Sequence, residues 1–396
     1  MEARATRVRG PGSISLLIGV GLLLLTVASY FRPPLLPEIG RDLVISPLGL
    51  GLLGSIFAVG RTAADFPAGW LSDRLSAGPM MFFGGALIGL GSIALATAPN
   101  DLVAYGSMFF LGVGSTFALT TAMAHFARAP RARRGVAMSA FAAWLLAGQS
   151  LGPALSGFLA VGAGWRLAMW VAAGIALTVG VALLWLRAPA PAPAASSHHD
   201  SAPPIDAPRH VLALIYLLPA VQFAIGGALL QTLIPIVADG ELGIGPGTVG
   251  AALGVGGVIR FVSALASGRI SDSISRRWAL VPSQAIQSLG VVVFMLWATP
   301  AAWFGSIVLL TLGSTGVNIG AAVLGDLSEG RPLGKRLGAF RFTGDAAFIV
   351  APLLCGWLYE VAGRAAATAP MAAFAIAVTI SVAFLLPETG RRPPAT

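Results

Sequence analysis

Residues 61–74, RTAADFPAGWLSDR, recur in sparse form in the second half of the chain as RFVSALASGRISD, residues 260–272. Both copies keep arginine, glycine, serine and aspartate at a single offset of 199 residues. The same offset aligns residues far outside the segment, among them Gly114-Ser115-Thr116 with Gly313-Ser314-Thr315, Pro153 with Pro352, and Gly157 with Gly356. The chain is therefore predicted to consist of two structurally similar halves.

The amino-acid composition indicates the environment in which these two halves fold. Hydrophobic residues make up 56% of the chain and charged residues only 10%, whereas about a quarter of the residues in a soluble domain are charged. Twelve apolar runs, six in each half, approach the roughly 20 residues that a helix needs to cross a bilayer. They begin near Ser13, Pro47, Pro79, Leu102, Val136 and Trp165, and again near Val211, Pro246, Trp278, Ala302, Leu337 and Ala366. These runs predict an all-α membrane protein with twelve transmembrane helices in two pseudo-symmetric six-helix bundles.

The predicted domains are an N-terminal bundle over residues 1–187, a cytoplasmic linker over 188–208, and a C-terminal bundle over 209–396. The linker is rich in Pro and Ala and has no apolar periodicity, so we expect a flexible tether. His198 and His199 lie in it without a cysteine or a second histidine pair nearby, which argues against a metal site. The only cysteine, Cys355, excludes an intrachain disulfide and is predicted to pack in helix 11. No metal or cofactor is expected.

The basic residues are distributed unevenly between the predicted loops. With the amino terminus in the cytoplasm, 19 of the 25 fall on the cytoplasmic side, and four, Arg32, Arg41, Arg166 and Arg364, are expected on the other side. The remaining two, Arg61 and Arg260, lie inside predicted helices. This bias follows the positive-inside rule and predicts a multi-pass protein of the plasma membrane with both termini cytoplasmic. It also explains the net charge of +9 without a nucleic-acid partner.

Two groups of motifs carry a resemblance to a known family. The segment from Gly69 to Arg74 resembles the signature loop between helices 2 and 3 of the major facilitator superfamily, and the segment from Gly268 to Asp272 resembles its degenerate second copy. In helix 5, Gly148, Gly152, Pro153, Ser156 and Gly157 are similar to the motif of the drug and proton antiporter branch. The chain is thus identified as a member of this superfamily that resembles the antiporter branch. One departure is Met108, which stands where that branch usually carries an arginine.

The resemblance implies a set of gating residues. These are Gly69, Asp73, Arg74, Gly268, Asp272, Arg341, Gly152 and Pro153. In the family, the carboxylate at the position of Asp73 faces the start of helix 11, where the helix dipole favours a negative charge. Arg341 is its predicted partner here, and Gly69 is expected to let helix 2 approach a neighbouring helix. The simpler alternative for this loop is a solvated turn that fixes the topology.

Charged residues deep in the membrane are the best candidates for function. Arg61 lies about 18 Å from Asp73 at the helical rise, near the bilayer midplane, where an arginine costs about 2.5 kcal/mol or more and needs a partner. Asp65, one helical turn away, is a candidate partner, and the alternative is that Arg61 is free to contact the substrate. Arg260 has Ala264 at the corresponding position. Its candidate partners are therefore Asp345, Asp326, Asp65 or an anionic group on a substrate, since transporter sites lie at the midplane between the repeats.

Further candidates complete the predicted site. Helices 7 and 10 line the cavity in this superfamily, so Gln231 and Asn318 are predicted, with Arg61 and Arg260, to contact the substrate. Asp65 and Asp345 are the predicted proton carriers. Gln149, Gln222, Gln284 and Gln287 are expected to be interhelical hydrogen-bonding residues only.

These features support three hypotheses about function. The first is a secondary active transporter that moves a small organic molecule by alternating access, as an antiporter in proton-coupled efflux. The second is uptake or exchange of a small organic or inorganic anion bound by Arg61 and Arg260. The third, from another class, is a non-transporting membrane assembly or sensor protein on the same fold. An enzyme is not expected, because the sequence has no Ser-His-Asp arrangement, metal-ligand cluster or phosphate loop. The expected partners are the substrate, protons and the lipid bilayer, and the expected state is a monomer.

Overall fold

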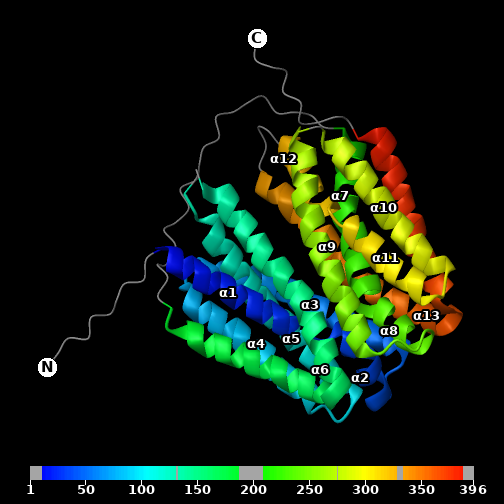
Figure 1. Ribbon diagram of the computed structural model, residues 1–396. Coiled ribbons are helices and arrows are strands. Elements are labelled where there is room, and N and C mark those ends of the chain that lie inside the picture. The colour runs from blue at the N-terminus through cyan, green and yellow to red at the C-terminus, as the bar shows by residue number, and fades with distance from the viewer. Residues whose placement is uncertain (1–10, 131–132, 187–207, 274, 328–332, 387–396) are drawn as a thin grey trace.

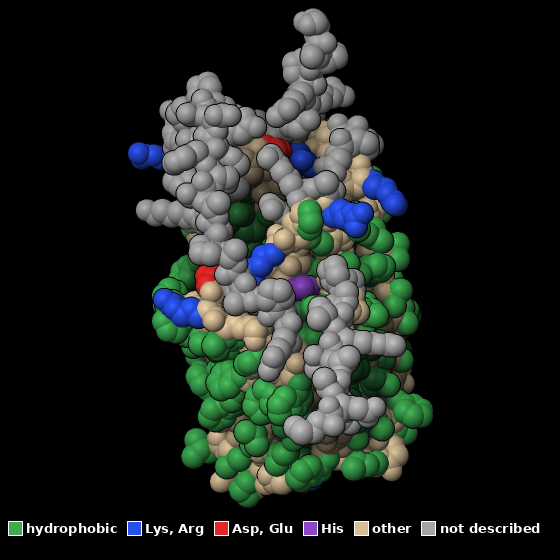
Figure 2. Space-filling model, turned by 90° about the vertical axis from the view of Figure 1, so that its left-hand side faces the viewer, with side chains coloured by type: hydrophobic (Ala, Val, Ile, Leu, Met, Phe, Trp, Pro, Cys, Tyr) green, Lys and Arg blue, Asp and Glu red, His purple; other side chains and the backbone are tan. Residues whose placement is uncertain are grey.

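The computed structural model describes residues 11–130, 133–186, 208–273, 275–327 and 333–386, which are almost entirely helical (Figure 1). Ten helical stretches in these ranges are long and apolar enough to cross a membrane. Figure 2 shows the corresponding surface, with hydrophobic side chains covering most of the lower part and most visible basic side chains in the upper part. The prediction of an all-α membrane protein is confirmed.

The described residues of the first half form seven helical elements. They are α1 (Pro11–Ser29), the 3₁₀ turn η1 (Pro33–Leu35), α2 (Leu36–Asp42), α3 (Pro47–Ser72), α4 (Ala77–Ala96), α5 (Asp101–Ala127) and α6 (Arg134–Leu184). The second half contains α7 (Arg209–Ala224), the π-helix η3 (Ile225–Leu233), α8 (Ile234–Gly240), α9 (Pro246–Ser273), α10 (Arg276–Leu296), α11 (Pro300–Leu312), α12 (Gly316–Asp326) and α13 (Leu333–Leu385). Both halves begin with an interrupted helix.

Two of the helices contain a pair of membrane crossings each. The apolar stretches of α6 and α13 are both 50 residues long, about 75 Å at the helical rise and more than twice the thickness of a bilayer core. Each stretch reverses at a glycine with a φ of 76°, Gly164 in α6 and Gly363 in α13. This left-handed conformation is accessible to glycine at no steric cost. The ten stretches therefore agree with twelve predicted crossings.

Among the described residues, three crossings depart from regular α-helix along their length. The first changes from α1 to η1 around residues 30–35, and the seventh changes to η3 at the equivalent place in the repeat. The tenth is broken at residues 313–315, between α11 and α12, whereas its counterpart α5 is continuous. Ser283 of α10 supports that break by donating a hydrogen bond to the carbonyl of Gly313 at 2.8 Å. Interrupted helices are a common way to build transporter binding sites.

Each half has its own hydrophobic core. One core consists of residues between Ile18 and Leu186, joined from the second half by the buried Ile236 and Phe348. The other consists of residues between Val211 and Leu386 and includes Cys355, which is buried as predicted. The predicted linker, with His198 and His199, lies almost entirely outside the described residues, so the domain limits stay a prediction.

The two halves meet along two pairs of helices, α3 with α13 and α6 with α9. Figure 1 shows the helices of the two halves together at the lower end of the view and spread apart toward the end at which α1 begins and α13 finishes. We call that end the terminal end and the other the opposite end. The two contact zones are named the α3–α13 seam and the α6–α9 seam.

Candidate functional site

The α3–α13 seam is closed at the opposite end by glycines. A Cβ atom on Gly51 of α3 would overlap the carbonyl of Pro352 in α13 and lie 3.3 Å from the Cα of Gly356. A Cβ atom on Gly356 would in turn lie 2.5 Å from the carbonyl oxygen of Pro47. Small residues permit such close approach of helices in membranes. The backbones of the two helices are therefore in direct contact here.

The α6–α9 seam repeats this crossing with the equivalent residues. A Cβ atom on Gly250 would overlap the carbonyl of Pro153 and lie 3.0 Å from the Cα of Gly157, and one on Gly157 would overlap the carbonyl of Pro246. Each of these residues is 199 positions from its counterpart in the first seam. Gly152, the neighbouring predicted gating residue, instead packs on α1, where its Cβ atom would lie 2.7 Å from the carbonyl oxygen of Val27.

Polar contacts also join the halves at the opposite end. Arg41 forms a salt bridge with Asp239 at 3.4 Å, and Glu360 accepts a hydrogen bond from the amide of Leu48 at 2.9 Å. The opposite end is thus closed by backbone packing and by side chains on the rim.

At the terminal end, by contrast, the signature-loop residues Gly69, Gly268 and Asp73 do not hold the two halves together. A Cβ atom on Gly69 or Gly268 would meet nothing within 4 Å, so the predicted close approach at Gly69 is wrong for this conformation. Asp73 is exposed and pairs at 3.5 Å with Arg128 of its own half. The predicted pair of Asp73 with Arg341 does not form in this conformation, because the halves are apart at this end and Arg341 pairs with Asp65.

The other two predicted gating residues of these loops are Arg74 and Asp272. Arg74 stacks on the ring of Trp70, with the guanidinium carbon 3.6 Å from the ring centroid. The side chain of Asp272 lies outside the part of the chain that the structure describes.

Arg341 instead joins two carboxylates inside the α3–α13 seam. It lies 3.0 Å from Asp65 of α3 and 3.8 Å from Asp345 of α13, and we call these three residues the triad. Asp345 is buried. The predicted pair of Arg61 with Asp65 is wrong, because Arg341 reaches Asp65 from across the seam. The triad brings the two predicted proton carriers together with a cation between them.

Arg61 faces the same seam nearer its middle. Its guanidinium lies over the ring of Phe348 in α13, 5.6 Å from the centroid. Arg61 is also within electrostatic range of Asp345, but no described carboxylate lies within salt-bridge distance of it.

Arg260, the counterpart of Arg61, lies in the other seam. It donates a hydrogen bond to the side-chain oxygen of Gln149 in α6 at 3.3 Å, and Gln149 donates to the hydroxyl of Tyr30 at 3.2 Å. Asp65 is held by Arg341, and Asp326 by Arg276 at 3.2 Å. None of the three predicted acids therefore pairs with Arg260 among the described side chains. Gln149, expected only to link helices, is its partner.

Arg32 is the functional candidate that the sequence missed. It was expected on the outer side of the membrane with Arg41, Arg166 and Arg364. Those three do form ion pairs at the opposite end, with Asp239, Asp42 and Glu241 respectively. Arg32, by contrast, is only 4% exposed. The prediction failed because the chain turns at residues 30–35 while still at depth, so that the prolines after Arg32 lie in a buried 3₁₀ turn rather than in an external loop.

No acid among the described residues forms a salt bridge with Arg32. Its guanidinium donates to the side-chain oxygen of Gln231 at 2.8 Å and lies 3.8 Å from the centroid of Phe57. It also approaches the sulfur of Met108 at 3.9 Å, so a cation from the first crossing occupies the region where the antiporter branch would place one on the fourth. The Nε atom of Arg32 is buried without a hydrogen-bond partner. Gln231 thus contacts Arg32, which the sequence did not place in the site, rather than Arg61 or Arg260, and no described contact joins Asn318, which is exposed, to any of the three.

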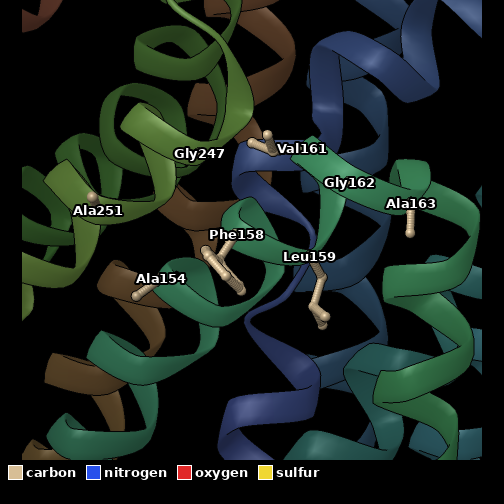
Figure 3. A pocket seen from close by; sticks show the side chains of 8 residues that line it. All are labelled: Ala154, Phe158, Leu159, Val161, Gly162, Ala163, Gly247 and Ala251. Carbon is tan, nitrogen blue, oxygen red and sulfur yellow. The ribbon is translucent and has the colours of Figure 1, made fainter.

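A separate apolar groove lies on the outside of the α6–α9 seam (Figure 3). It encloses about 600 Å³ and is lined by Ala154, Phe158, Leu159, Val161, Gly162, Ala163, Gly247 and Ala251. Phe158 is 77% exposed. The groove has no charged lining residue, so it cannot recognise an ion and is not the candidate site.

The described residues hold no group of three or more His, Cys, Asp or Glu side chains that could bind a metal ion. What they bring together is a set of arginines at the meeting point of two interrupted helices and two seams. This arrangement suits the binding of a negatively charged molecule.

Comparison with known proteins places this geometry in context. The model of the Major Facilitator Superfamily matches residues 17–237 and again residues 218–396. No curated protein matches the sequence significantly. Two similar solved structures are of a bacterial homologue of the human lysosomal transporter Spinster. The inward-facing, unoccupied form has a TM-score of 0.72 at 12% identity and covers 94% of both chains. The inward-facing, occupied form has a TM-score of 0.74 at 12% identity and covers 94% of this chain and 91% of that one.

Proposed function

Because the chain belongs to the Major Facilitator Superfamily, and is a membrane transporter rather than an enzyme, we propose that it moves a small organic anion by alternating access. The observation that carries this proposal is the arginine pair, Arg61 and Arg260, at equivalent positions of the two halves. Neither forms a salt bridge with a described carboxylate. A cation at depth in a membrane is costly without a partner, and an anionic substrate would supply one. The second sequence hypothesis is thus the one that the geometry supports best.

The conformation fits one step of such a cycle. The opposite end is closed at two glycine crossings, whereas Gly69 and Gly268 at the terminal end face open space. If both termini are cytoplasmic, as the distribution of basic residues predicts, this is an inward-facing state. Closure around Gly69, Gly268 and Asp73 would then complete the outward-facing state, which gives the signature loop its gating role.

The triad supports proton coupling as part of the same proposal. Asp65 and Asp345 share one cation, Arg341, across the seam between the halves. Protonation of Asp65 would weaken the contact between α3 and α13 and favour their separation. Proton exchange for the substrate, and with it the efflux direction implied by the antiporter motif, rests on this cluster and on that resemblance.

Transport by the purified full chain in proteoliposomes tests the proposal. We expect saturable uptake of at least one small organic anion from a panel that also contains lipophilic cations. Arg260→Gln should reduce that uptake to the level of empty liposomes, because an amide cannot neutralise the anion. Arg209→Gln, at an exposed position of α7, is the matched control and should leave it unchanged. Saturable uptake of cations alone would exclude an anionic substrate, and no flux of any kind would favour a sensor or assembly protein.

A further inference from the structure

Arg32 changes the charge balance of the site on which the proposed function rests. The central side chains are linked to one another electrostatically. Arg61 is within range of both Arg32 and Asp345, and Tyr30 is within range of both Arg32 and Arg260. Four arginines of this group, Arg32, Arg61, Arg260 and Arg341, stand against two carboxylates, Asp65 and Asp345. The described centre therefore carries an excess of two positive charges.

The excess is divided between two places. The triad and Arg61 lie in the α3–α13 seam, where the two carboxylates balance two arginines. Arg32 and Arg260 are the arginines left over, and their described acceptors are neutral: the Gln231 amide at 2.8 Å and the Met108 sulfur at 3.9 Å for Arg32, and the Gln149 amide at 3.3 Å for Arg260. Tyr30 is within electrostatic range of both arginines, and its hydroxyl accepts a hydrogen bond from Gln149. Two separate anionic groups, rather than one, match this distribution.

The described side chains leave part of the hydrogen-bonding capacity of Arg32 unused. It is more than nine-tenths buried, and its Nε atom has no acceptor. Its one strong hydrogen bond is to Gln231, which is itself partly exposed and lies in the π-helix. A carboxylate can accept two parallel hydrogen bonds from a guanidinium, whereas the amide oxygen of Gln231 accepts one here. An anion that displaced this amide would satisfy the orphan donor as well.

We propose that the substrate is an organic dianion with two separate anionic groups, such as a dicarboxylate. One group binds Arg32 in place of the Gln231 amide, and the other binds Arg260. Arg32 and Gln231 then determine that the transporter selects a dianion over a monoanion. This inference deepens the proposed function and depends on it.

The experiment compares matched pairs of anions on the full chain in proteoliposomes at neutral pH. The panel contains linear dicarboxylates from oxalate to adipate, each with the monocarboxylate of the same chain length, and glycerol phosphate as a dianion whose charges share one group. For the wild type, we expect at least one dicarboxylate to compete for transport about tenfold or more better than its monocarboxylate, the effect of one charged hydrogen-bonded contact.

Three variants then assign the preference to Arg32. Arg32→Gln should abolish the preference by weakening the dicarboxylate about tenfold while leaving the monocarboxylate nearly unchanged. Gln231→Glu should do the same without removing the arginine, because the new carboxylate neutralises it. Gln231→Met is the control at the same position, since it removes the amide without adding charge, and it should keep the preference.

The outcomes separate this inference from the proposed function. Equal competition by mono- and dicarboxylates in the wild type, a preference for glycerol phosphate, or a loss in Arg32→Gln that is the same for both members of a pair would overturn the dianion while leaving anion transport intact. Absence of any anion transport in the wild type would instead remove the proposed function itself.

Discussion

The two seams between the halves are alike at one end and different at the other. At the opposite end both seams use equivalent residues. Gly51 and Pro352 form the close crossing in the α3–α13 seam, and Gly250 and Pro153 form it in the α6–α9 seam. In the middle, Arg61 faces Phe348, whereas Arg260 faces Gln149, the residue equivalent to Phe348.

The difference is largest toward the terminal end. The triad lies in the α3–α13 seam, and its three equivalents in the α6–α9 seam are apolar, namely Ala264, Ala142 and Leu146. The comparison teaches that the symmetric part of the fold performs the closure that both halves must share. The charged groups are divided, with two carboxylates and Arg341 in one seam and Arg260, bonded to an amide, in the other.

The largest expected effect is on closure at the opposite end. Gly51→Ala and Gly250→Ala should each disfavour the closed crossing by about 3 kcal/mol, the upper end of overpacking costs, because the obstructing atoms belong to the backbone. Transport should fall, and cysteines introduced near Pro47 should become accessible to membrane-impermeant thiol reagents. Gly106→Ala, where a Cβ atom meets nothing, is the control. If only one of the two variants lost transport, the two seams would not be equivalent in closing the opposite end.

The next effect concerns coupling. Asp65→Asn removes the charged contact with Arg341, worth about 1.5 kcal/mol or more, and should make substrate flux in proteoliposomes indifferent to an imposed pH gradient. Ala264→Asn introduces the same amide at the equivalent position of the other seam and should leave the response intact. A flux that still follows the gradient in Asp65→Asn would show that the coupling group lies elsewhere.

A smaller effect is expected from exchanging the residues that face Arg61 and Arg260 in the middle of the two seams. Gln149→Phe gives Arg260 the environment of Arg61 and removes one hydrogen bond, so that substrate affinity should change by about 1 kcal/mol. The half-saturation concentration for the transported anion measures this change. Phe348→Gln is the reciprocal variant. If it altered substrate affinity more than Gln149→Phe does, Arg61 rather than Arg260 would be the arginine that contributes more to substrate binding.

The smallest effect on the stability of this conformation is at Asp73. Its pair with Arg128 is exposed, with side-chain exposures of 76% and 41%, so Asp73→Asn should change the unfolding free energy by less than about 0.5 kcal/mol. It should nevertheless slow transport more than it weakens binding, because the loop is needed when the terminal end closes. Weaker binding with unchanged turnover would place the gate elsewhere.

The sequence predicted the repeat, the membrane environment, the twelve crossings and the family, because each depends on patterns along the chain. It failed where partners come from different helices. Spacing along one helix paired Arg61 with Asp65, whereas the seam supplies Arg341. Arg32 was placed outside because Pro33 and Pro34 resemble a loop, although they are buried. A signal was present, since Arg32 and Gln231 are separated by the repeat offset of 199 residues, but an offset alone does not reveal that two residues touch.

That contact has a geometric consequence. A side chain that touches its own counterpart stands on the pseudo-twofold axis, where the two halves of a duplicated chain compete for the same space. Had both positions kept arginine, two like charges would face each other within hydrogen-bonding distance, away from water, and would repel. The halves of such a duplicated chain must therefore differ at this point, and Arg32 with Gln231 is the form that the difference takes here.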